Sequence, residues 1–249
     1  MPHEQAVVTT PDGECPVHLF TPGLAAPPCT PAIILFMDAG GIRPAILAMA
    51  QRLSQAGYVV AVPDLFYRFG AYGPFDPRKV FKGDFRAILG PLMATTGNPK
   101  AAEDTAALLD WLAARTDVGG GKVGAVGFCM GGGMAIAAAG IRPDRFAAVA
   151  SFHGGNLATD GAGSPHGFAP ALRAEIYIAA AADDSSYPPA MAARFEAALD
   201  AAHARHASET YPAAHGWMMP DFPVYDEAAA ERGWGAMLAL FDRTLRTCA

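Results

Sequence analysis

The chain is short of positive charge and has no long hydrophobic run. It carries 18 Lys and Arg against 24 Asp and Glu in 249 residues, which gives a formal net charge of −6 at pH 7. This balance argues against a nucleic-acid-binding protein, which usually presents a basic face. No apolar run approaches the ~18 residues that a membrane helix needs, and residues 1–4 do not resemble a secretory signal. We therefore expect a cytoplasmic protein that binds neither nucleic acid nor a membrane.

Cysteine is also scarce. The four cysteines lie far apart and form no CxxC pair; they are Cys15, Cys29, Cys129 and Cys248. A structural zinc site would use paired spacings, and a chain of this length does not need disulfides in order to fold. The sequence therefore predicts no metal site. By default each cysteine would be a small buried apolar residue.

Apolar residues are plentiful. They make up 52% of the chain, whereas charged residues make up 17%. This composition supplies a full hydrophobic core and excludes an intrinsically disordered chain. No internal repeat or long linker divides the sequence. We therefore expect one domain over residues 1–249.

Apolar, strand-like runs alternate with segments of helical periodicity. The expected strands are 5–9, 15–20, 32–37, 58–62, 122–128, 147–152, 176–181 and 208–211. One expected helix begins at Pro44 and stops at Gly57, and the others are 100–115, 130–141, 189–202 and 227–245. The alternation predicts an α/β fold, with a doubly wound, mostly parallel sheet and helices on both faces. A turn at 11–13 joins the first two strands into an N-terminal antiparallel hairpin at one edge.

Two segments interrupt this alternation. Residues 66–99 begin with five aromatics in ten positions and continue with several Lys and Arg. Residues 156–170 are rich in glycine and contain few apolar residues. Long insertions in a compact domain are usually functional or disordered. We expect the first segment to be a lid over a site and the second to be a flexible loop.

The most informative motif surrounds Cys129. Glycines flank this cysteine at minus two and plus two, Gly127 and Gly131, where a strand ends and a helix begins. A nucleophile on such a sharp turn needs small neighbours, and this spacing is typical of the G-x-S-x-G nucleophile elbow with Cys in place of Ser. Two alternatives are tight packing of a helix on a strand and a phosphate-binding loop. The G-x-x-x-x-G-K-[ST] spacing of the second alternative is absent.

Candidates for an acid and a base follow in the order that an α/β-hydrolase requires. Asp183 and Asp184 come after the strand 176–181, and His215 comes after the strand 208–211. The carboxyl ends of parallel strands meet at one edge of a sheet, so these side chains should lie near Cys129. Alternatively, the histidine is simply solvated and the aspartates form a turn. His153 also ends a strand and could reach the same edge.

The sequence resembles the dienelactone hydrolase family of α/β-hydrolases from the strand 32–37 to the C-terminal helix. The similar segments are the cysteine elbow 127–132, Gly57-Tyr58 with Pro63-Asp64-Leu65-Phe66, Asp184 with Pro188, and His215-Gly216-Trp217. The acid motif favours Asp184 over Asp183. The resemblance also implies a carboxylate after the third strand, usually Glu, which takes the proton of the resting thiol. Asp38 stands there, either in that role or as a residue that caps the following turn.

One departure from the family concerns substrate recognition. The family's model enzyme holds a substrate carboxylate with arginines, one of them just after the catalytic histidine. Residues 216–219 of this chain contain no arginine. The substrate is therefore expected to differ, and Arg43, Arg68 or Arg86 could form another anion clamp or be solvated surface residues. Candidate substrate-binding residues are Trp217, His153, Arg86 and Tyr67.

Together these features predict a hydrolase of a small carboxylic ester or lactone that needs no cofactor. Cys129 would attack, His215 would take its proton and Asp184 would orient the imidazole. The backbone N–H groups of Met130 and Ala39 would hold the oxyanion. Alternatives are a thioesterase or acyltransferase with the same triad, a ligand-binding protein without hydrolytic activity, and a redox-sensing role for Cys129. We expect a monomer or a small homo-oligomer.

Overall fold

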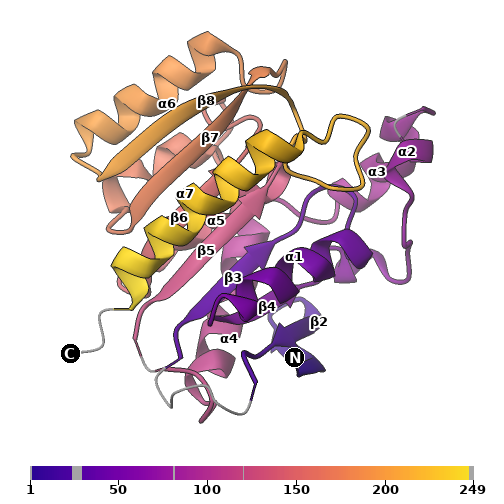
Figure 1. Cartoon of the computed structure of the whole chain (residues 1–249), viewed down its shortest axis with the longest axis vertical. Coiled ribbons are helices and arrows are strands. Elements are labelled where there is room, and N and C mark those ends of the chain that lie inside the picture. Colours follow the sequence, from indigo (N-terminus) through magenta and orange to yellow (C-terminus); the bar gives the residue numbers. More distant parts are fainter. Residues whose placement is uncertain (1, 24–29, 81, 120, 247–249) are drawn as a thin grey trace.

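The computed structural model describes residues 2–23, 30–80, 82–119 and 121–246, and it contains one eight-stranded sheet (Figure 1). Cys29 and Cys248 lie outside the described residues. The strand order is β1-β2-β4-β3-β5-β6-β7-β8. The strands are β1 (His3–Thr10), β2 (Gly13–Phe20), β3 (Ala32–Phe36), β4 (Val59–Pro63), β5 (Val123–Phe128), β6 (Phe146–Phe152), β7 (Glu175–Asp183) and β8 (His206–Ala214).

Strand direction agrees with the sequence-based prediction. β1 and β2 form an antiparallel hairpin, and β2 is also antiparallel to β4. All other neighbouring strands are parallel. The predicted mostly parallel α/β architecture with an N-terminal hairpin is therefore confirmed.

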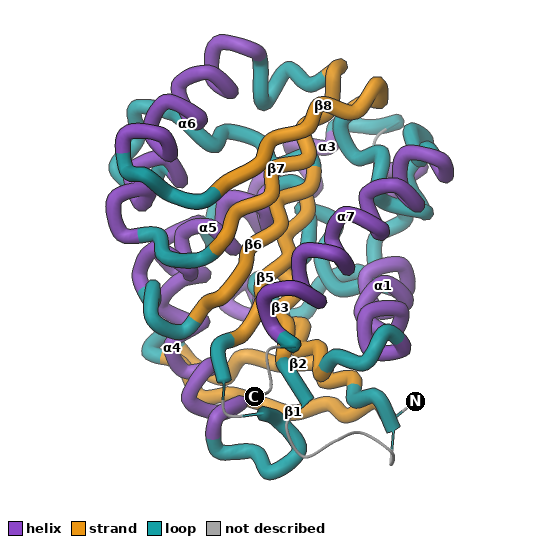
Figure 2. The backbone as a smooth tube through the Cα atoms, turned by 60° about the vertical axis from the view of Figure 1, so that its left-hand side comes forward, coloured by secondary structure: helices purple, strands orange, loops and turns teal. Residues whose placement is uncertain are grey.

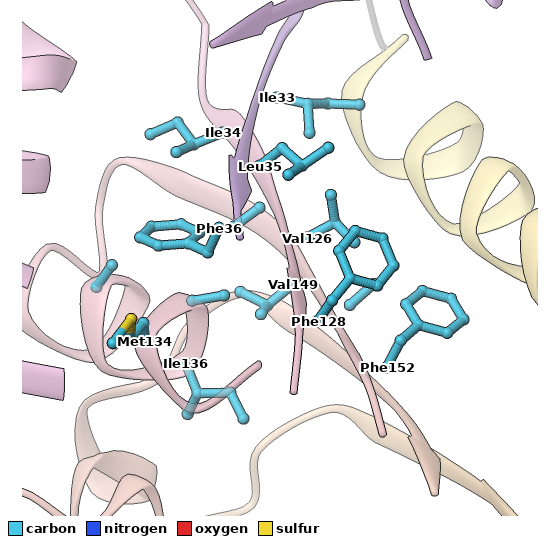
Figure 3. Packing of buried hydrophobic residues seen from close by; sticks show 14 of the residues in the cluster. Ile33, Ile34, Leu35, Phe36, Val126, Phe128, Met134, Ile136, Val149 and Phe152 are labelled. Atoms are coloured by element: carbon cyan, nitrogen blue, oxygen red, sulfur yellow. The ribbon is translucent and has the colours of Figure 1, made fainter. Parts of the chain in front are cut away.

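Helices cover both faces of the sheet. Figure 2 shows α1 (Pro44–Gln55) and α7 (Glu227–Leu245) on one side, and α4 (Asn98–Ala113), α5 (Met130–Ile141) and α6 (Pro189–Ala201) on the other. Every residue of β3, β4 and β5 is buried, as expected for strands between two helical layers. Figure 3 shows the packing of α5, with Met134 and Ile136, against Phe36, Val149 and their neighbours from the central strands.

The segment 66–99 is partly helical. It contains the short helix η1 (Tyr67–Phe69), α2 (Pro77–Val80) and α3 (Phe85–Met93). The Asp84 side chain accepts a hydrogen bond from the Ala87 N–H (3.1 Å) and so caps α3. The function of this segment as a lid stays a prediction.

The segment 156–170 is held by specific hydrogen bonds. The Ser164 hydroxyl accepts one from the Thr159 N–H (2.8 Å), and the Asn98 amide donates one to the Gly163 carbonyl (2.9 Å). The helix η2 (Pro165–Ala171) follows. Among the residues that the structure describes, none of the helices combines the length and apolarity of a membrane span.

Candidate active site

Cys129 stands at the sharp turn between β5 and α5. Its backbone has φ 54° and ψ −118°, a left-handed conformation that costs free energy for a residue with a side chain. The residue is half-buried at the N-terminus of α5. The N-terminal end of a helix favours an anion, because its first N–H groups have no intrahelical acceptor. This position suits a thiolate.

Two glycines permit the turn. A Cβ atom on Gly127 would overlap the carbonyl group of Gly131, and a Cβ on Gly131 would overlap the carbonyl oxygens of Phe36 and Met37. The first turn of α5 therefore packs directly on the end of β3. This contact brings the β3–α1 loop, which contains Ala39, beside the elbow. Met130 and Ala39 are both half-buried there.

The structure pairs Asp184 with His215. The His215 Nδ1–H donates to Asp184 Oδ2 (2.7 Å), and the carboxylate is almost completely buried. The other oxygen, Oδ1, accepts from the backbone N–H and the hydroxyl of Ser186 (2.8 and 2.6 Å). Asp183 is exposed, and its carbonyl accepts from the His215 N–H (3.0 Å). Ser186 was not identified from the sequence, although an Asp followed two residues later by Ser is typical of a local turn.

The protonation of His215 depends on its two neighbours. Burial lowers the pKa of His215, but hydrogen bonds to Asp184 and Cys129 and the charges of both outweigh it and raise this pKa to about 10. Burial raises the pKa of Asp184, whereas hydrogen bonds from His215 and Ser186 bring it below its usual value. The arrangement therefore favours an imidazolium between a carboxylate and the Cys129 sulfur.

Replacing Cys129 by Ala should lower the pKa of His215 from about 10, because the Cys129 hydrogen bond and charge are both removed. The pKa is measured by following the His215 ring signals by NMR as the pH is changed. Cys15→Ala is the matched control, since Cys15 is a buried thiol in β2 of the N-terminal hairpin and its replacement should leave this titration unchanged. An unaltered His215 titration in the Cys129 variant would contradict the coupling.

His153 lies directly behind the elbow. It is fully buried, and its Nδ1 accepts a hydrogen bond from the Cys129 backbone N–H (3.2 Å). Its ring lies edge-on to the His215 ring, with centroids 5.2 Å apart. Burial and the proximity of His215 lower the pKa of His153 well below its usual value. The structure thus places His153 beside Cys129 and His215 as a neutral imidazole.

The other candidate substrate-binding residues are held in different surroundings. Trp217 is fully buried and stacks on Tyr211, with centroids 4.3 Å apart. The Tyr67 hydroxyl is hydrogen-bonded to Thr10 (2.6 Å) and Asp104 (3.0 Å). Arg86 is exposed, with its guanidinium 5.9 Å from the centre of the Phe85 ring. None of these contacts includes Cys129, Asp184 or His215.

The candidate arginines also differ in environment. Arg68 is half-buried and forms two hydrogen bonds with Asp104 (2.8 and 2.9 Å). Arg43 is fully buried between Asp38 and Asp221, so it is not a solvated surface residue. The position of Asp221 after His215 was not recognised as important in the sequence.

Both oxygens of Asp38 are engaged. Oδ1 accepts from the Gly40 N–H (2.8 Å) and from Arg43 Nη1 (2.6 Å), and Oδ2 accepts from Arg43 Nη2 (2.9 Å). Arg43 in turn donates to Asp221 through Nε (2.6 Å) and Nη2 (3.1 Å). Asp38 therefore forms the turn into α1 and, through Arg43, anchors the loop that follows His215.

A cleft of about 440 Å³ opens beside this loop. Its walls come from α2, from Lys82 and from the loop 216–226. The lining residues are Arg78, Lys82, Pro220, Phe222, Pro223 and Tyr225. Within the described ranges, no group of three or more His, Cys, Asp or Glu is placed to hold a metal ion.

Comparison with known proteins gives consistent results. A model of the dienelactone hydrolase family matches residues 17–245. A relative from Escherichia coli K12, named "Putative carboxymethylenebutenolidase", is 30% identical over 217 residues, which cover 85% of this chain and 76% of the relative. A Synechocystis protein with the same name is 25% identical over 222 residues, 87% of each chain.

Solved structures extend this similarity to the fold. A crystal structure from Klebsiella pneumoniae, described as "Putative Dienelactone Hydrolase", superimposes with a TM-score of 0.84 at 25% identity and covers 97% of this chain and 98% of its own. The dienelactone hydrolase from Anabaena variabilis superimposes with a TM-score of 0.65 at 20% identity, covering 98% of this chain and 99% of its own.

Proposed function

The chain belongs to the dienelactone hydrolase family, and on this premise we propose that it hydrolyses a carboxylic ester or lactone through a covalent acyl-enzyme on Cys129. The observation that carries the proposal is the hydrogen bond between Asp184 and His215 (2.7 Å) beside the cysteine at the elbow, which helps to raise the pKa of His215. A nucleophile, a base and a group that orients the base are the parts that acyl transfer requires.

The first half of the reaction forms the acyl-enzyme. The Cys129 sulfur, whose proton His215 has taken, attacks the carbonyl carbon. The N–H groups of Met130 and Ala39 stabilise the oxyanion, because both lie where β3 and α5 meet the elbow. The tetrahedral intermediate then expels the alkoxide, which receives a proton from His215. In a lactone this alkoxide stays attached to the acyl group.

The second half of the reaction, hydrolysis of the acyl-enzyme, depends on the loss of negative charge at the Cys129 sulfur. In the resting site the hydrogen bond and charge of Cys129 help to keep the pKa of His215 at about 10. A thioester sulfur carries no negative charge, so acylation lowers this pKa and leaves a neutral imidazole. His215 can then take a proton from water as the water attacks the thioester, and the tetrahedral intermediate expels the Cys129 thiolate and releases the carboxylic acid. The proposed steps do not use Asp38, whose oxygens accept hydrogen bonds from Arg43 and the Gly40 N–H. Its role as an auxiliary carboxylate stays a prediction.

The proposal also gives a place for the substrate. The cleft between Arg78, Lys82 and the loop after His215 is the opening through which we expect a small ester to approach. One wall belongs to the segment 66–99, which keeps its proposed role as a lid. The cytoplasmic location expected from the sequence stays a prediction.

Trapping of the acyl group tests the proposal. The enzyme is mixed with an activated aryl ester, quenched with acid within a few turnovers, and digested for mass spectrometry. We expect an initial burst of phenolate close to one equivalent of enzyme, and the acyl group on the peptide that contains Cys129. Turnover without an acylated Cys129 peptide, or with the acyl group on another residue, would overturn the mechanism.

A further inference from the structure

The backbone N–H of the candidate nucleophile is shared between two acceptors. Cys129 N–H points to the Phe152 carbonyl (3.1 Å) and to His153 Nδ1 (3.2 Å). β5 and β6 are parallel neighbours with Phe128 opposite Phe152, so both strands end at the same level. The side chain of His153 therefore reaches across from the next strand to the residue on which the chemistry depends.

Both residues joined by this hydrogen bond have an unfavourable backbone. Cys129 has φ 54° and His153 has φ 39°, and among the described non-glycine residues only Asn156 and His203 share such values. Positive φ persists in a residue with a side chain only where surrounding contacts impose it. The hydrogen bond from Cys129 to His153 is one such contact, and it ties two strained turns together.

The hydrogen bond also determines the state of the His153 ring. Because Nδ1 accepts a hydrogen bond, it must present its lone pair, and the neutral ring then carries its proton on Nε2. Nε2 is buried and has no hydrogen-bond partner among the described residues. A positive charge on the His153 ring would also face the His215 imidazolium, since the two ring centroids lie 5.2 Å apart. Burial and this neighbour keep the ring neutral.

A direct chemical role does not fit the position of His153. The residue has 0% exposure, and its ring packs among Phe128, Trp217 and His215. It cannot touch a substrate carbonyl, but it contacts both members of the nucleophile–base pair. Building on the proposed function, we propose that His153 is a positioning residue that holds the Cys129 backbone in its strained turn and supports the ring of His215.

Two substitutions distinguish the effect of the hydrogen-bond acceptor of His153 from the effect of its side-chain volume. His153→Asn keeps an acceptor near the position of Nδ1 and tolerates positive φ. His153→Leu fills much of the space but offers no acceptor. We expect the Leu variant to lose about 10- to 100-fold in kcat with little change in KM, since a small misplacement of reacting groups has such an effect. The Asn variant should recover most of the loss.

A second readout does not depend on ester turnover. The rate of Cys129 alkylation by iodoacetamide is measured as a function of pH in the same variants. We expect the pH profile to shift in the Leu variant and to return toward that of the unaltered enzyme in the Asn variant. If no cysteine-dependent esterase activity is found, the proposed function fails, whereas the alkylation profiles still test the role of His153.

His203→Leu is the matched control. His203 also has a positive φ (53°), but it is exposed after α6, so its replacement should change neither kcat nor the alkylation profile. Should His153→Leu not fold, His153→Ala carries the same comparison with Asn. A folded variant without the acceptor that keeps both the kcat and the alkylation profile of the unaltered enzyme would overturn the proposal. So would an Asn variant that loses as much as the Leu variant.

Discussion

Replacing Cys129 by Ala is expected to lower kcat/KM for an activated aryl ester by about 10³-fold or more. The variant has no sulfur to attack the carbonyl, and the His215–Asp184 pair has no thiol to deprotonate. The N–H groups of Met130 and Ala39 remain, so binding and oxyanion stabilisation leave a small residual rate. His215→Ala should cost a similar factor, because the two residues act as one unit, and the double variant should be little worse.

The measurement is a steady-state time course for each variant at equal concentrations of folded protein. Cys15→Ala serves as the control, since burial raises the pKa of this thiol to about 12 and makes it unreactive. Equal turnover in Cys129→Ala and the unaltered enzyme would sink the cysteine mechanism. The result is independent of His153, which is intact in all of these variants.

Replacing Arg43 by Ala is expected to lower the free energy of unfolding by about 3–5 kcal/mol, the range for removing one partner of a buried ion pair. Asp38 has a side chain that is 1% exposed, and it would be left as an uncompensated buried charge. Asp221, which is 29% exposed, would lose its anchor but could still be hydrated. Because Asp221 lies in the loop after His215, esterase activity should also fall.

Urea titration at neutral pH measures this change. Arg194→Ala is the control, because the Arg194–Asp160 pair is exposed on both sides and should contribute about 0–1 kcal/mol. A loss below about 1 kcal/mol for Arg43→Ala would show that Asp38 finds other compensation. Asp38→Asn combined with Arg43→Met removes the charges together and should recover part of the stability, since the uncompensated charge is the main cost.

The free energy of unfolding should depend on pH through His215 and Asp184, whose pKa values change on folding. A histidine whose pKa is raised on folding stabilises the protein fully below its unfolded value, near 6.5, and loses this contribution as the pH rises through about 10. Asp184, whose pKa is lowered on folding, stabilises the protein above the usual carboxyl range. This contribution to the free energy of unfolding is lost at acidic pH, as the pH falls through the lowered pKa.

Some features followed from the sequence because they are local. The parallel sheet could be predicted from continuous apolar runs such as that of β3, since strands between two helical layers are buried on both faces. The elbow could be predicted because its glycine spacing is local, and the need for Gly127 arises from its contact with Gly131. The contact that requires Gly131 comes from the distant residues Phe36 and Met37. The order of acid and base followed from strand ends that share one edge of the sheet.

Other features depend on residues that the fold brings together from distant positions. Spacing alone left Asp183 and Asp184 open, because the exact residue at which β7 ends decides which side chain faces His215. The sequence also left both interpretations of Asp38 open, because its surroundings depend on a residue far away in the chain. Its partner Arg43 is bound from the other side by Asp221, 178 positions further along the chain.

The helices inside 66–99 were missed for a different reason. α3 contains Pro91, which argues against a helix, and α2 has only four residues. The capping side chain of Asp84 was the available sign of a helix start. Tyr67 was proposed from its residue type alone, which could not reveal that its hydroxyl is hydrogen-bonded to Thr10 of β1 and Asp104 of α4.

The order of the strands has a consequence for protein synthesis. β5 carries the elbow, but the Asp184 carboxylate and the His215 imidazole follow β7 and β8, which leave the ribosome after β5. Until β8 pairs with β7, the nascent chain contains Cys129 without the proposed base His215, and on that proposal the thiol keeps the low reactivity of an ordinary cysteine. Recovery of activity during refolding would therefore report the completion of the C-terminal half of the sheet, whereas fluorescence or helix content would also report earlier steps.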